Sequence, residues 1–100
     1  MRIIDLLKEE SIDLHGPQGN KTDTLTHLVH LMDNSGNLED TTSYLQAVLK
    51  REAEGSTGIG EGIAIPHAKT SAVKTPGLAA MIVKDGIDFD SLDGATAHLF

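Results

Sequence analysis

The sequence contains no cysteine among its 100 residues. Disulfide bonds, zinc sites built on thiolates and a cysteine nucleophile are therefore excluded within this chain. The absence does not fix the redox compartment of the protein.

Aromatic residues are scarce as well. The chain has only Tyr44, Phe89 and Phe100, so we expect a core built from Leu, Ile, Val and Ala. Acidic residues outnumber basic ones, which gives a formal net charge of −7. Few aromatic rings and an excess of acids argue against a nucleic-acid-binding surface. The charge favours a basic protein partner, although simple solubility explains it equally well.

Long hydrophobic runs are also missing. No apolar stretch approaches the ~20 residues that a membrane-spanning helix needs. The N-terminal segment carries Asp5, Glu9 and Glu10, which come too early for a signal peptide. We therefore expect a cytoplasmic domain without direct membrane insertion. One hundred residues fit a single domain, residues 1–100.

The most informative stretch covers residues 56–70, Ser-Thr-Gly-Ile-Gly-Glu-Gly-Ile-Ala-Ile-Pro-His-Ala-Lys-Thr. Its three alternating glycines predict a flexible loop, and residues 63–65 predict a short buried strand. Pro66 suits the end of that strand because it has no backbone N–H. His67 then stands where the strand stops, where α/β proteins tend to bind ligands. His67 is the candidate reactive residue; the alternative is an ordinary surface or capping histidine. The glycine spacing matches neither a P-loop nor a Rossmann fingerprint.

Apolar periodicity predicts two helices and two further strands around this stretch. A helix from about residue 22 carries an apolar stripe and ends near Gly36. A second helix covers about residues 39–53. Residues 78–83 predict a central strand, and residues 95–100 predict a strand that stops without a turn. Together with a short helical turn at residues 2–9 and a strand at residues 11–15, the pattern predicts an α/β fold with a single mixed sheet.

Two other groups of polar residues suggest metal sites but lack the required pattern. His27 and His30 are three residues apart, without a third ligand, so we interpret them as a solvated helix face. The aspartates of residues 85–93 lack the spacing and the distal Glu of a calcium loop, so we interpret them as turn residues. The sequence predicts neither a metal nor a cofactor.

Arg51 lies at the border of the apolar stripe of the second helix. Its guanidinium is suited to phosphate oxygens because it offers a planar fork of donors. The alternative is a weak surface pair with Glu52 or Glu54.

The stretch STGIGEGIAIPHAK resembles the active-site signature of fructose/mannitol-type IIA domains (EIIA type 2) of the bacterial sugar phosphotransferase system. AVLKREAEGSTGIG resembles the helix end before that signature, and DGIDFDSLDG resembles the turn after the following strand. The third block favours the fructose branch. The resemblance implies a mixed sheet with helices on both faces. It also implies that residues 1–100 are the N-terminal two thirds of one domain, with a second active-site histidine beyond residue 100 that His98 does not replace.

The resemblance further implies a phosphoryl carrier. His67 would accept phosphate from the phosphohistidine of HPr and pass it to a cysteine of an EIIB domain during fructose-type sugar uptake. Arg51 would accompany His67. The candidates for phosphate or partner contact are the hydroxyls of the first two loop residues, the N–H groups of the glycine loop, two apolar residues around His67 and a lysine: Ser56, Thr57, Gly58, Ile59, Ile65 and Lys69.

Two alternatives stay open at this point. The first is a regulatory module of the same ancestry, of the nitrogen-system or transcription-regulator kind, phosphorylated on His67. The second is an unrelated binding domain in which His67 is structural. The sequence leaves open the sugar, the oligomeric state, and whether the domain is fused to EIIB or to a membrane permease.

Overall fold

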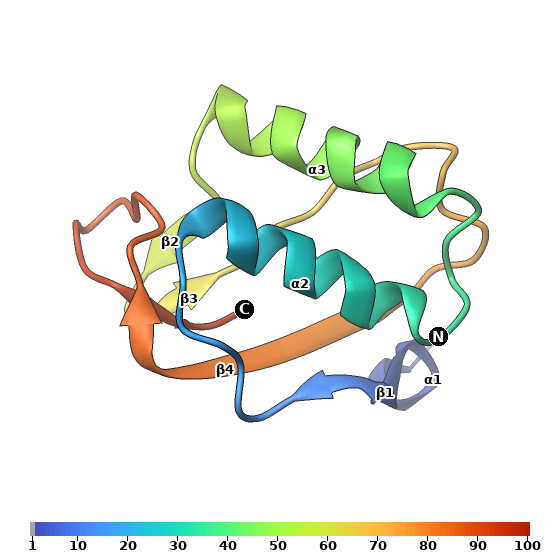
Figure 1. The fold of residues 1–100 in the computed structure, drawn as a ribbon, viewed down its shortest axis with the longest axis horizontal. Coiled ribbons are helices and arrows are strands. Elements are labelled where there is room, and N and C mark those ends of the chain that lie inside the picture. Colours follow the sequence, from blue (N-terminus) through green and yellow to red (C-terminus); the bar gives the residue numbers. More distant parts are fainter. Residues whose placement is uncertain (1) are drawn as a thin grey trace.

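The computed structural model describes residues 2–100. Within these residues, three helices and five strands follow one another (Figure 1). In order they are α1 (Ile3–Leu6), β1 (Leu7–Asp13), α2 (Lys21–Asp33), α3 (Thr41–Glu54), β2 (Gly58–Gly60), β3 (Ile63–Ala64), β4 (Leu78–Ile87) and β5 (Ala97–Leu99).

All five strands belong to one sheet with the order β1-β4-β5-β3-β2. The pairs β1/β4 and β3/β5 are parallel, whereas β2/β3 and β4/β5 are antiparallel. The predicted single mixed sheet with flanking helices is therefore confirmed. Strands β3 and β5 are parallel, so their carboxyl ends point to the same edge of the sheet. The segment with His67 leaves the sheet beyond the carboxyl end of β3, which is the position expected from the sequence.

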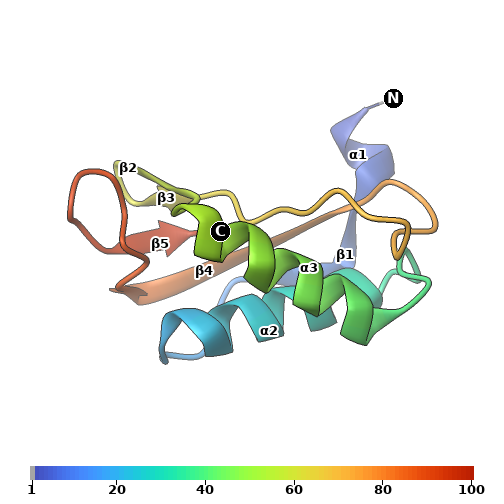
Figure 2. The ribbon, with the colours of Figure 1, turned by 90° about the horizontal axis from the view of Figure 1, so that it is seen from above.

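Both long helices begin at residues that cap them. The side-chain oxygen of Asn20 accepts a hydrogen bond from the backbone N–H of Asp23 at 2.8 Å, and Asp40 accepts one from Ser43 at 3.1 Å. The two helices run antiparallel and pack on each other, and α2 also packs on β4 and β1 (Figures 1 and 2). The apolar stripe predicted for each helix can thus pack against a neighbouring element.

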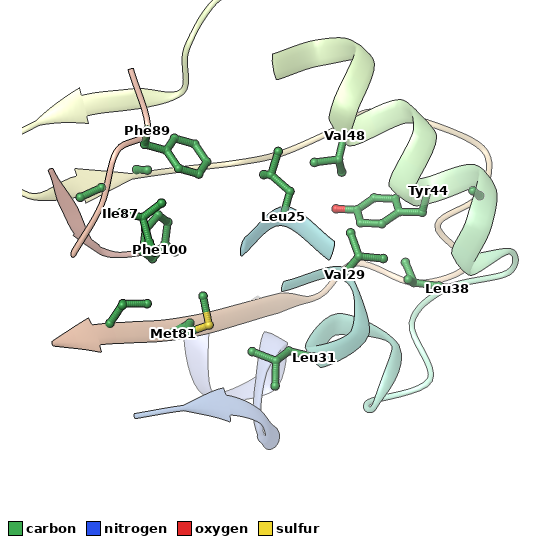
Figure 3. Packing of buried hydrophobic residues seen from close by; sticks show 14 residues of the cluster. Leu25, Val29, Leu31, Leu38, Tyr44, Val48, Met81, Ile87, Phe89 and Phe100 are labelled. Atoms are coloured by element: carbon green, nitrogen blue, oxygen red, sulfur yellow. The ribbon is translucent and has the colours of Figure 1, made fainter. Parts of the chain in front are cut away.

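The core contains more aromatic side chains than the expected aliphatic core. Tyr44, Phe89 and Phe100 are all buried, and the ring centroids of Phe89 and Phe100 lie 5.3 Å apart (Figure 3). Aromatic side chains bury the most apolar area per residue, so the few in this chain contribute most from a central position. The remaining labelled core residues come from the helices, the 34–40 connection and β4: Leu25, Val29, Leu31, Leu38, Val48, Met81 and Ile87.

Two strands are longer than the sequence predicts. Strand β4 continues to Ile87 through residues 84–86, where we expected a turn. Gly86 has a φ of 80° there, and a Cβ atom on it would lie 2.8 Å from the His98 ring, so a glycine lets β5 pack against the bend. Strand β1 begins at Leu7 and ends at Asp13 because its parallel pairing with β4 overrides the local charged pattern.

Within residues 2–100, no helix is both long enough and apolar enough to cross a membrane.

Candidate functional site

His67 lies on an exposed segment three residues after the end of β3. Its Nδ1 atom lies 2.8 Å from the backbone carbonyl oxygen of Ile65. A carbonyl oxygen only accepts hydrogen bonds, so Nδ1 carries the hydrogen in this arrangement. In the neutral ring, Nε2 is then the nitrogen with the free lone pair. The geometry therefore leaves the Nε2 lone pair of an exposed ring free of this hydrogen bond.

The glycine-rich segment before His67 is a β-hairpin, which corrects the predicted flexible loop. Strands β2 and β3 pair in antiparallel fashion and are joined by Glu61 and Gly62. Three consecutive residues have positive φ, namely 104° at Gly60, 56° at Glu61 and 80° at Gly62. Such a turn favours glycine, and it shortens the connection enough for the two strands to pair.

The connection between β4 and β5 holds this hairpin in place. The carboxylate of Asp93 accepts a hydrogen bond from the backbone N–H of Glu61 at 2.9 Å, and the N–H of Leu92 donates to the carbonyl of Gly58 at 3.0 Å. Hydrogen bonds from the N–H groups of Glu61 and Ala95 lower the pKa of the Asp93 carboxyl. The hairpin is therefore anchored from a segment some thirty residues later in the sequence.

The end of α3 anchors the other side of the hairpin. Glu52 is buried, and its carboxylate accepts hydrogen bonds from the backbone N–H and the hydroxyl of Thr57 at 2.8 and 2.5 Å. Lys21 forms an ion pair with the same carboxylate at 2.9 Å. Burial would raise the pKa of Glu52, but the hydrogen bonds from Thr57 and Lys21 outweigh burial and lower the pKa. Glu52 is therefore ionised at neutral pH.

The hydroxyls of Ser56 and Thr57 are both engaged within the protein. Ser56 donates to the carbonyl of Phe89 at 2.6 Å and accepts a hydrogen bond from the N–H of Gly58 at 3.0 Å. Thr57 is buried and donates to Glu52. Both side chains thus support the hairpin. Sequence reasoning missed Glu52 as the partner of Thr57 because Glu52 looked like a surface residue next to Arg51.

Arg51 lies at the border of α3, partly exposed, as its position on the helix predicts. Its guanidinium donates to the carbonyl of Gly55 at 2.8 Å. Among residues 2–100, no hydrogen bond joins Arg51 to His67, and Lys69 is exposed. The structure therefore joins Arg51 to Gly55 and not to the imidazole by a hydrogen bond, and the phosphate-binding role of Arg51 and Lys69 stays a prediction.

Exposed apolar side chains gather around the hairpin. Ile59 and Ile65 are 53% and 55% exposed, and Leu92 is 79% exposed. Ile59 and Leu92 line one shallow hollow together with Ile63. Sequence reasoning did not single out Leu92; the signal that could have found it is a large apolar residue between the polar residues Ser91 and Asp93.

A larger apolar cleft of about 830 Å³ opens beside His67. Its walls come from α2, α3, the segment around His67, the start of β4 and Phe100.

The two histidines of α2 that the sequence suggested as a possible metal pair lie in different environments. His27 is partly buried, and its Nε2 atom lies 2.8 Å from the carboxylate of Asp13, which corrects its predicted position on a solvated face. His30 is exposed. Within the described residues 2–100, no three His, Asp or Glu side chains form a group that could hold a metal ion.

Comparison with protein families gives a match over residues 5–100 to the model described as phosphoenolpyruvate-dependent sugar phosphotransferase system, EIIA 2. A fructose-specific EIIABC component of the same system from Bacillus subtilis is 46% identical over 99% of this chain and 16% of its own length. A fructose-specific EIIA component from Haloferax volcanii is 42% identical over 90% of this chain and 58% of its own length. The chain thus spans less than two thirds of both relatives.

Solved structures give the same result at lower identity. Nitrogen regulatory protein IIA-Ntr from Neisseria meningitidis superposes with a TM-score of 0.85 at 28% identity, over 95% of this chain and 64% of that one. Enzyme IIA of the mannitol system, in complex with phosphorylated enzyme IIB from Escherichia coli, superposes with a TM-score of 0.80 at 27% identity, over 94% of this chain and 67% of that one. The sequence match over nearly the whole chain and the shared fold lead to one conclusion: this chain belongs to the EIIA 2 family of the phosphoenolpyruvate-dependent sugar phosphotransferase system.

Proposed function

We propose that this chain is a phosphoryl carrier of the sugar phosphotransferase system, in which His67 takes phosphate from phosphorylated HPr and passes it to a cysteine of an EIIB domain during fructose-type sugar uptake. The hydrogen bond between His67 Nδ1 and the carbonyl of Ile65 carries the proposal. It leaves the Nε2 lone pair of an exposed imidazole available for attack on phosphorus.

In the first step, the Nε2 lone pair forms a bond to phosphorus while the bond between phosphorus and the donor imidazole breaks. The donor nitrogen keeps the electron pair of that bond. Attack through Nε2 leaves positive charge on the His67 ring, and the carbonyl of Ile65 stabilises this charge by accepting the Nδ1 hydrogen. In the second step, a thiolate of EIIB forms a bond to phosphorus, the Nε2–phosphorus bond breaks, and the ring returns to its neutral form.

The rest of the site would position the phosphoryl group and stabilise its equatorial oxygens. We assign this role to the guanidinium of Arg51, to backbone N–H groups of the hairpin and to the positive potential of Lys69. Arg51 donates to an exposed carbonyl, that of Gly55, and exchanging this bond for one to a phosphate oxygen costs little. Ser56 and Thr57 act one step away, by holding the hairpin.

Partner proteins would dock on exposed apolar residues of this region, namely Ile59 and Leu92 at the hairpin and Ile65 two residues before His67. The net charge of −7 suits a basic face on HPr. Two relatives named above support an EIIB acceptor, since one is a fused EIIABC component and the other is a IIA enzyme in complex with phosphorylated IIB. A transfer rate that does not change with ionic strength would contradict the electrostatic part of this assignment.

A regulatory role is the second candidate, and the likeness to nitrogen regulatory protein IIA-Ntr favours it. The higher identity to fructose-specific relatives supports the carrier. Both candidates place the phosphoryl group on His67, so transfer to an EIIB domain separates them.

We also propose that residues 1–100 are the N-terminal two thirds of a cytoplasmic EIIA domain. This chain covers 58% of the Haloferax relative and 64% and 67% of the two solved chains, which supports a length of about two thirds of the domain. Strands added after Phe100 would find apolar surface in the cleft beside His67.

The test uses the full parent domain, phosphorylated HPr and intact mass spectrometry. We expect one phosphoryl group on the wild type and none on His67→Gln, with His98→Gln as a matched control that still accepts phosphate. Adding EIIB should then remove the phosphoryl group. A folded wild type that gains no mass would refute the carrier and the regulatory proposals together, and retention of the group in the presence of EIIB would favour the regulatory one.

A further inference from the structure

We infer that Glu52 is a positioning residue for His67, acting through a chain of hydrogen bonds that runs by way of Thr57 and Ile65. The inference rests on the proposed function, because it assigns Glu52 a role in preparing the same imidazole. Glu52 itself belongs to α3, fifteen residues before His67, and contacts neither a phosphoryl group nor the ring in this arrangement.

The first link joins Glu52 to Thr57. The two oxygens of the carboxylate accept from two donors of the same residue, the backbone N–H at 2.8 Å and the hydroxyl at 2.5 Å. Two bonds to one residue fix its orientation as well as its position. The side chain of Glu52 is only 5% exposed, so water competes little for these donors. This link closes the corner between the end of α3 and the first strand of the hairpin.

The second and third links join Thr57 to the imidazole. The carbonyl of Thr57 accepts a hydrogen bond from the N–H of Ile65 at 3.0 Å. The carbonyl of Ile65 accepts one from Nδ1 of His67 at 2.8 Å. Each intermediate residue thus donates on one side and accepts on the other. A shift of Thr57 moves Ile65, and a shift of Ile65 changes the acceptor that selects the tautomer of His67.

Lys21 stabilises the ionised carboxylate of Glu52, from which the chain of hydrogen bonds starts. Its Nζ atom lies 2.9 Å from Glu52 and 3.5 Å from Asp90, and it stands 4.9 Å from the centre of the Phe89 ring. A buried carboxylate without a cation would be costly, so Lys21 is the partner that allows Glu52 to stay ionised. The backbone carbonyl of Phe89 also accepts the hydroxyl of Ser56, so α2, α3 and the connection after β4 meet at this corner.

A purely structural role for Glu52 is the alternative, and two substitutions separate the two roles. Glu52→Gln keeps the size of the side chain but replaces an acceptor by a donor, which faces the donors of Thr57 and Lys21. Thr57→Val removes the hydroxyl and keeps the shape, and Thr57→Ser restores the hydroxyl. Glu54→Gln is the matched control, since Glu54 is an exposed glutamate on the same helix.

The experiment records long-range ¹H–¹⁵N correlations of the His67 ring in the parent domain, without any donor, and then the single-turnover rate of transfer from phosphorylated HPr. We expect a ring with Nδ1–H in the wild type, in Glu54→Gln and in Thr57→Ser. We expect mixed tautomers in Glu52→Gln and Thr57→Val, and transfer slowed by about 10-fold to 100-fold.

Variants that keep the wild-type amide spectrum, tautomer and transfer rate would overturn the inference. If Glu52→Gln fails to fold, Thr57→Val decides by the same two readouts. The tautomer is read without phosphate, so a wild type that accepts no phosphoryl group would refute the proposed function and leave the tautomer result to decide on Glu52.

Discussion

The hydroxyl of Ser91 occupies the place that a side chain on Gly58 would need. A Cβ atom on Gly58 would lie 2.5 Å from Ser91 Oγ and 3.0 Å from Ser91 Cα. Real Cβ atoms essentially never approach another heavy atom as closely as 2.5 Å. The first residue of the hairpin is therefore a glycine because of a close approach, although φ is not positive there.

Gly58→Ala should destabilise the protein by about 1–3 kcal/mol, the usual cost of overpacking. Urea unfolding measures this cost. Ser91→Ala should be close to neutral, since the buried Ser91 hydroxyl has no hydrogen-bond partner among residues 2–100. The double variant should recover part of the loss, and strict additivity of the two substitutions would contradict the steric explanation.

Acid should remove the stabilisation that Glu52 provides. The folded-state pKa of Glu52 is lowered by its hydrogen bonds with Thr57 and Lys21, which outweigh the opposing effect of burial. A lowered pKa means that the contribution is present above the unfolded pKa, about 4.3, and is lost as the pH falls through the folded pKa. At pH 7, Glu52→Gln should lower the free energy of unfolding by about 1–3 kcal/mol.

The difference in the free energy of unfolding between the wild type and Glu52→Gln should shrink as the pH falls below about 4. Urea unfolding at several pH values tests this, and taking the difference between two proteins cancels the titration of the other carboxylates. A difference that stays constant from pH 7 to pH 3 would show that Glu52 does not carry this charge-dependent stabilisation.

Arg51→Ala should slow phosphoryl transfer by about 10-fold to 100-fold, because a positioned charge acts on the transition state. The free energy of unfolding should change by less than about 0.5 kcal/mol, since the Arg51 guanidinium donates to an exposed carbonyl, that of Gly55. Lys50→Ala removes an exposed charge from the neighbouring position and serves as the control. Equal rates in both variants would argue against a role for Arg51 in the reaction.

Leu92→Ser should raise KM for phosphorylated HPr by about 5-fold or more if Leu92 is an anchor of the docking surface. Its 79% exposure predicts little effect on stability. Leu14→Ser is the control, because Leu14 is a 61% exposed leucine outside the hairpin. If Leu14→Ser raises KM as much as Leu92→Ser does, the effect reflects general surface polarity and the docking assignment is wrong.

Much of the fold follows from local patterns in the sequence. The apolar stripes of α2 and α3 and the apolar run of β4 are visible in the chain, and each produced the element expected of it. The longer extents of β4 and β1 depend on their neighbours in the sheet. From the sequence alone, Gly86 is typical of a turn. Its role in the strand depends on the close packing of His98, which only the folded structure shows.

The candidate site divides in the same way. His67 could be singled out because a short strand and a proline lead to it. The hairpin could not be predicted, since Leu92 holds its first strand and Asp93 holds its turn, and both lie far away in the sequence. Glu52 could not be found either: a glutamate near a helix end is typically solvated, and its burial depends on Lys21, which comes from another helix.

The most direct test of the account is the identity of the nitrogen that carries phosphorus. Long-range ¹H–¹⁵N correlations of the phosphorylated parent domain assign the phosphoryl group to one nitrogen of one histidine. The account predicts Nε2 of His67, with Nδ1 still protonated and bonded to the carbonyl of Ile65. Phosphorus on Nδ1 of His67, or on any other histidine, would contradict it.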